Sequence, residues 1–95
     1  MLEPWRQVID ERERLLLEEE LRKEIGDRHP LADLQIKVHA RRDDRDDVLV
    51  SLEDGRVAEF HLTWSGKKDA HPNWPRTIIL ESMEEWQMKA ASDLA

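Results

Sequence analysis

His61, Asp69 and His71 lie close together in the chain, and imidazole and carboxylate groups of this kind can bind a transition metal. Their spacing matches no known metal-binding motif, however. Ser65, Asp69 and His71 contain the residue types of a hydrolase triad. That chemistry requires a nucleophile on a tight turn and an oxyanion hole, and the sequence shows neither. We therefore expect no catalytic residue, no metal ion and no cofactor here, and we do not predict an enzyme.

The same stretch contains the residue types of a protein-binding surface. Tryptophan and arginine often anchor protein interfaces, and prolines limit the entropy that is lost on binding. Pro72 and Pro75 predict an extended loop from Ser65 to Thr77. A loop of this length often binds a partner, and the alternative is a self-packed loop that Trp74 fixes to the domain. The candidate binding residues are His61, Thr63, Lys67, Lys68, His71, Trp74 and Arg76.

A run of aspartates forms a second group with possible chemistry, because calcium binds clustered carboxylates. The run comprises Asp43, Asp44, Asp46 and Asp47. An EF-hand loop requires spaced acids, a central glycine and a final glutamate, and this run lacks the glycine. Arginines between the aspartates neutralise their charge. We therefore interpret the run as a solvated turn.

Composition limits the classes of function. The chain has 95 residues, which predicts one domain over residues 1–95. It has no cysteine, which excludes disulfides and thiolate zinc sites. A formal net charge of −7 argues against nucleic acid as a partner, because phosphate binding requires a clustered positive field. No apolar run approaches the roughly 20 residues of a membrane span, and the first residues lack a secretion signal. We expect a cytoplasmic protein with no membrane partner.

The elements that must position these residues begin with a helix. Asp10 and Glu13 form a capping box, and leucines at helical spacing follow it. Gly26 stands where a helix C-terminus favours a left-handed residue. These signals predict a helix over Glu11–Ile25.

Three strands follow, and we expect them to form an antiparallel meander. In the first strand, the alternation places Leu34, Ile36, Val38 and Ala40 on one face. In the third, the inward residues are predicted to be Ala58, Phe60, Leu62 and Trp64. A three-residue hairpin loop with Gly55 in the left-handed conformation pairs Val50 with Ala58. We prefer this register because a slip by one residue would turn charged side chains towards the core.

The rest of the chain predicts a short fourth strand, "RTIIL", and a C-terminal helix that begins with a Ser82–Glu85 capping box. Each predicted helix has one apolar stripe and the sheet has one apolar face. We therefore predict an α+β fold with an N-terminal helix, a three-stranded antiparallel meander plus a short fourth strand, and a C-terminal helix. Both helices should cover one sheet face. The other face, which includes Leu49, Glu59 and His61, should be open to solvent.

The segments "HLTWSG", "WPRT" and "SMEEW" make the chain similar to a group of small bacterial proteins for which no activity is known. The matching residues are Leu17–Leu21, Ala40–Leu49, His61–Gly66 and Trp74–Thr77. The resemblance implies a small bacterial cytoplasmic protein.

We expect a non-enzymatic module that binds another protein through the Ser65–Thr77 loop, in an accessory or inhibitory role. The acidic surface would direct it to a basic target. The alternative is a domain that binds or converts a small ligand in a pocket around His61, His71 and Trp74. The chain could act as a monomer or as a homodimer.

Overall fold

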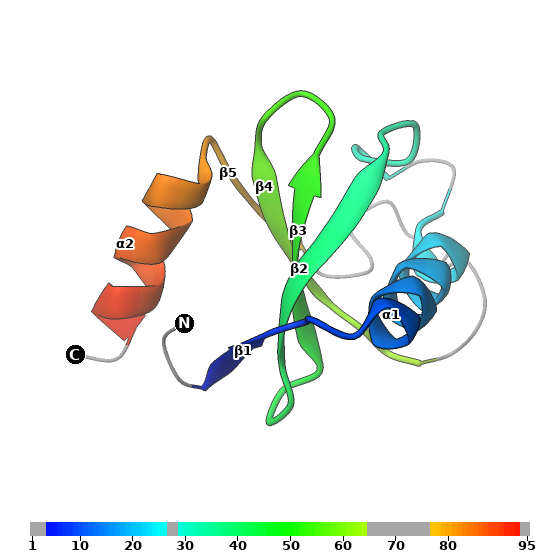
Figure 1. Cartoon of the computed structure of the whole chain (residues 1–95). Coiled ribbons are helices and arrows are strands. Elements are labelled where there is room, and N and C mark those ends of the chain that lie inside the picture. The colour runs from blue at the N-terminus through cyan, green and yellow to red at the C-terminus, as the bar shows by residue number, and fades with distance from the viewer. Residues whose placement is uncertain (1–3, 27–28, 65–76, 94–95) are drawn as a thin grey trace.

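The computed structural model describes residues 4–26, 29–64 and 77–93. Its elements follow one another as strand β1, helix α1, strands β2 to β5 and helix α2 (Figure 1). Their bounds are β1 (Trp5–Gln7), α1 (Glu11–Glu24), β2 (Ile36–Arg42), β3 (Asp47–Leu52), β4 (Val57–His61), β5 (Thr77–Leu80) and α2 (Met83–Asp93). The fold is α+β, as the sequence predicted.

The described residues form a five-stranded antiparallel sheet in the order β1-β2-β3-β4-β5. The prediction of four strands was wrong because residues Trp5–Gln7 form an additional strand, β1, that pairs with the edge of β2. Trp5 pairs with Arg42, and Gln7 pairs with Ala40. Three residues give too short a pattern for local alternation to reveal a strand.

The register of the β3–β4 hairpin is confirmed. Val48 pairs with Phe60, and Val50 pairs with Ala58. Gly55 has φ 93°, a left-handed conformation that glycine adopts without a steric penalty. The amide of Gly55 donates to the carbonyl of Leu52 over 3.0 Å, which closes the turn.

A β-bulge interrupts the pairing of β2 with β3. Val38 pairs with Val50, but the next pair is Ala40 with Leu49, so His39 has no opposite residue. One extra residue moves all later side chains of the strand to the other face. Ala40 therefore lies on the face opposite Val38, and the prediction that both share a face was wrong.

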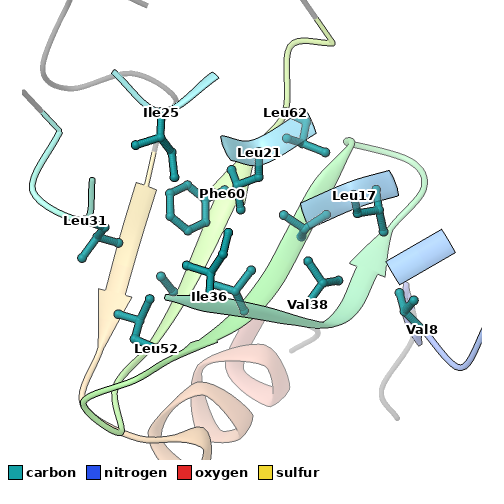
Figure 2. Close-up of a cluster of buried hydrophobic side chains, with 13 residues drawn as sticks. Val8, Leu17, Leu21, Ile25, Leu31, Ile36, Val38, Leu52, Phe60 and Leu62 are labelled. Carbon is teal, nitrogen blue, oxygen red and sulfur yellow. The ribbon is translucent and has the colours of Figure 1, made fainter. Parts of the chain in front are cut away.

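Helix α1 covers one face of the sheet and forms an aliphatic core there. Leu17, Leu21 and Ile25 pack against inward residues of β2, β3 and β4 around Phe60 (Figure 2). His29, in the connection from α1 to β2, is buried against Phe60 and hydrogen-bonds to Thr77 over 2.9 Å. This contact joins the connection to β5.

Helix α2 covers the opposite face, so the prediction that both helices share one face was wrong (Figure 1). Trp86 and Ala90 pack with Leu49 and Leu80 in a separate cluster. The indole of Trp5 meets that of Trp86 edge to face, with centroids 5.2 Å apart. The sheet has a second apolar patch because Leu49 and Val57 point away from α1, and α2 buries this patch.

Both helices begin at the predicted caps. The Asp10 carboxylate accepts from the amides of Arg12 and Glu13, over 2.8 and 3.4 Å. The Ser82 hydroxyl accepts from the amide of Glu85 over 3.1 Å. In the part of the chain that the structure describes, neither helix has the length and apolarity needed to cross a bilayer.

Candidate functional site

Of the seven candidate binding residues, the structure describes His61 and Thr63, and it places them in different surroundings. His61 lies at the end of β4, and its Nδ1 is 2.8 Å from a carboxylate oxygen of Asp47 on the α2 face. The Thr63 hydroxyl donates to Glu24 of α1 over 2.9 Å. They do not form one rim. Lys67, Lys68, His71, Trp74 and Arg76 lie outside the described residues, and their role remains a prediction.

The carboxyl group of Glu24 holds the chain that leaves β4. One oxygen accepts from the Thr63 amide over 2.8 Å and from the Thr63 hydroxyl, and the other accepts from the Trp64 amide over 2.8 Å. Glu24 is buried at the last residue of α1. A buried carboxyl group requires such donors, since an unpaired one is costly. Glu24 therefore fixes the direction of the chain after the sheet.

Burial raises the pKa of the Glu24 carboxyl, and its hydrogen bond with Glu20 raises the pKa further. Two carboxyl groups can share a hydrogen bond only when one of them is protonated. The donors of Thr63 and Trp64 favour the ionised form and oppose this rise, but the pKa stays above its ordinary value. Glu20 and Glu24 thus form a coupled acidic pair.

Trp64 is on the surface, so the prediction that it is a core residue was wrong. Its side chain is 47% exposed, and its φ is 60°. A left-handed backbone is uncommon for a bulky residue and strains the chain. Strand β4 ends at His61, and the bonds from Thr63 and Trp64 to Glu24 turn the chain away from the sheet. The turn brings the indole beside α1.

Trp64 and α1 together border a depression of about 440 Å³. We call this surface the α1 shelf. Its apolar lining is Leu16, Leu17 and Trp64, and its charged lining is Glu13, Glu19, Glu20, Lys23 and Arg41. Leu16 is 63% exposed, whereas Leu17 belongs to the core below. An exposed leucine and an exposed tryptophan thus lie at one acidic depression.

The aspartates of the β2–β3 turn are paired with arginines. Asp43 accepts from Arg6 over 2.7 Å, and Asp44 accepts from Arg42 over 2.9 Å. The bond from Arg6 lowers the pKa of Asp43. Within residues 4–26, 29–64 and 77–93, no three His, Asp or Glu side chains gather as metal ligands. These pairs support the interpretation of the run as a solvated turn.

Sequence reasoning missed Glu24. In the sequence Glu24 looks like the exposed acids of α1, and its partners Thr63 and Trp64 lie about 40 residues further along the chain. No local pattern reveals such a pairing.

Comparisons with protein families, with curated proteins and with solved structures find no match to this chain.

Proposed function

We propose that the chain is a non-enzymatic module that binds another protein through the α1 shelf and the adjoining Ser65–Thr77 segment. The observation that carries the proposal is the geometry of Trp64. A buried glutamate holds its backbone in a strained conformation, and the indole stays 47% exposed. Strain of this kind persists where the surroundings impose it and is concentrated at functional sites. Exposed tryptophans are frequent anchors of interfaces.

The shelf favours a partner segment that has an apolar side chain beside a lysine or arginine. Leu16 and Trp64 offer apolar contact, and Glu19 and Glu20 line the same depression. Glu19 pairs with Lys23 over 3.3 Å, and Glu20 shares a hydrogen bond with Glu24. A basic side chain of the partner would meet these acids beside Leu16 and Trp64. The net charge of −7 would accelerate association with such a partner.

The predicted loop extends this surface along the chain, because Ser65 directly follows Trp64. Trp74 and Arg76 would add a second anchor, of the residue types that interfaces favour. We therefore keep both residues in the proposed binding surface.

The test is a selection of random peptides on the folded wild-type chain, followed by affinity measurements with two matched variants. Leu15 and Leu16 are both exposed on α1, at 53% and 63%, but only Leu16 lines the shelf. We expect peptides with a basic residue beside an apolar one. Leu16→Asp should weaken their binding at least tenfold, and Leu15→Asp should leave it unchanged. The affinity of a folded Trp74→Ala variant measures how much the Ser65–Thr77 loop contributes to peptide binding.

The proposal fails if the selection yields no peptide, if the peptides are acidic, or if both leucine variants bind equally well. Loss of binding only in Trp74→Ala would assign the function to the loop and remove the shelf from it.

A further inference from the structure

The other face of the sheet carries a polar depression of about 370 Å³ beside α2. Its wall comes from the end of β2, the β2–β3 turn, β3, β4, β5 and α2. The residues that line it include Arg42, Arg45, Asp47, Glu59, His61, Ile78 and Lys89. A volume of this size suits a small molecule. It is separate from the α1 shelf, whose lining comes from α1, Arg41 and Trp64.

Both carboxylates in this depression already have partners within the protein. Asp47 is 2.8 Å from Nδ1 of His61. Glu59, which is buried, accepts from the indole Nε1 of Trp86 over 2.7 Å and from Lys89 over 3.4 Å. Neither carboxylate therefore requires a cation from a ligand.

The hydrogen bond from Arg42 lowers the pKa of Asp44, and the nearby charge of Arg45 contributes to this lowering. The guanidinium of Arg45 makes no hydrogen bond or ion pair with any of the described residues, whereas Arg42 beside it pairs with Asp44 over 2.9 Å. The depression thus contains an exposed guanidinium to which no described side chain hydrogen-bonds, in a chain whose net charge is −7. A guanidinium offers paired donors that match a carboxylate or a phosphate.

His61 offers a second polar contact, a ring nitrogen that can accept a hydrogen bond. A carboxylate only accepts, so the bond to Asp47 places the ring hydrogen on Nδ1 and leaves Nε2 as an acceptor in the neutral ring. Nε2 makes no hydrogen bond within the described part of the chain. It suits a ligand hydroxyl group. Ile78, which is 43% exposed, offers apolar contact in the same depression.

We propose that this depression binds a small organic anion, in which Arg45 holds a carboxylate or phosphate group and His61 accepts from a hydroxyl group. Such a site lies apart from the proposed protein-binding surface and does not depend on it.

The test is a titration of the full chain with glycerol 3-phosphate, lactate and inorganic phosphate at constant ionic strength. NMR amide chemical shifts report the binding of each probe. We expect saturable shifts at Arg45, Asp47 and His61. Arg45→Gln should raise the dissociation constant about tenfold, as the loss of a charged hydrogen bond implies. The matched control is Arg12→Gln, because Arg12 lies exposed on α1 and also forms no side-chain bond with the described residues.

Tighter binding of glycerol 3-phosphate than of inorganic phosphate, lost in His61→Phe, would show that the hydroxyl contact exists. Tighter binding of lactate than of both phosphates would make a carboxylate the anionic group. The proposal is overturned if no probe gives saturable shifts, if sodium chloride gives the same shifts, or if Arg45→Gln and Arg12→Gln bind alike.

Discussion

The two faces of the sheet are buried in different ways. Helix α1 covers its face with an aliphatic cluster that runs from Val8 to Leu62 across β2, β3 and β4 (Figure 2). Helix α2 covers the other face with fewer residues, centred on Trp86. Beyond α2 that face continues into the polar depression around His61. The α1 face thus has the larger apolar cluster of the described residues, whereas the α2 face has a polar depression beside a smaller cluster.

Among the described residues, the α1 side has two buried glutamates, Glu20 and Glu24, and the α2 face has Glu59. Glu24 and Glu59 have different tasks. Glu24 accepts from backbone amides and sets the path of the chain at Trp64. Glu59 accepts from Trp86 and Lys89 and so attaches α2 to β4. Glu24 thus lies where the chain leaves β4, whereas Glu59 lies between β4 and α2.

Matched truncations of one buried leucine on each face of the sheet should lower the stability most. Leu21→Ala, at a fully buried site, should lower the free energy of unfolding by about 3–4 kcal/mol. Leu80→Ala, on the edge strand β5 at 9% exposure, should lower it by about 2 kcal/mol, because an open site collapses more easily. Urea denaturation measures both. Equal losses would show that the α2 face contributes as much stability per leucine as the α1 face.

Removal of the indole N–H donor of Trp86 should have the next largest effect on stability. Trp86→Phe keeps most of the apolar contact but removes the bond to Glu59, and we expect a loss of about 2 kcal/mol. Adding Glu59→Gln should recover part of this loss, since an uncharged group is less costly to bury. Thermal and urea unfolding of the single and double variants test this. A double variant less stable than Trp86→Phe would mean that Lys89, not Trp86, stabilises Glu59.

The acidic pair on the α1 side should produce a pH dependence. The pKa of Glu24 is raised in the folded state, so the folded protein binds this proton more tightly than the unfolded chain. Its contribution to stability is therefore complete below the ordinary pKa of 4.5 and decreases as the pH rises through the raised value. Glu20→Gln removes one cause of the rise, so the variant should lose less stability than wild type above pH 4.5. Denaturant unfolding at several pH values tests this, and parallel curves would contradict it.

Breaking a surface ion pair at the α1 shelf should have the smallest effect on stability. Lys23 pairs with Glu19 at i,i+4 spacing, and both side chains are more than half exposed. Lys23→Gln should lower the free energy of unfolding by about 0.3 kcal/mol. A loss well above 1 kcal/mol, measured by urea denaturation, would show that the shelf supports the fold rather than serving as a surface for a partner.

Local patterns predicted the elements that depend on neighbours in the chain. The helix that begins at Glu11 and the register at Gly55 followed from caps, alternation and turn geometry, and both are confirmed, although the helix ends at Glu24, one residue before the predicted Ile25. The bulge at His39 was not predictable, because one unpaired residue leaves the alternation of its strand intact. Trp64 was misplaced because its position depends on Glu24, a distant partner.

The sequence carries one signal for the second buried face. Val48, Leu49 and Val50 form a continuous apolar run, which is typical of a strand buried on both faces. Glu59 concealed that face, since a charged residue in a strand predicts exposure unless a partner such as Trp86 is known. The polar depression could not be predicted, because its lining comes from stretches that lie far apart in the chain, from Arg42 to Lys89.

The order of the strands in the sheet has a consequence for how the chain folds. Short turns join β2 to β3 and β3 to β4, whereas the link from β1 to β2 encloses all of α1. Closing a short loop loses less chain entropy than closing a long one. We expect the three central strands to form first and β1 to join last. Native-state hydrogen exchange should accordingly find the amides of β1 the least protected in the sheet.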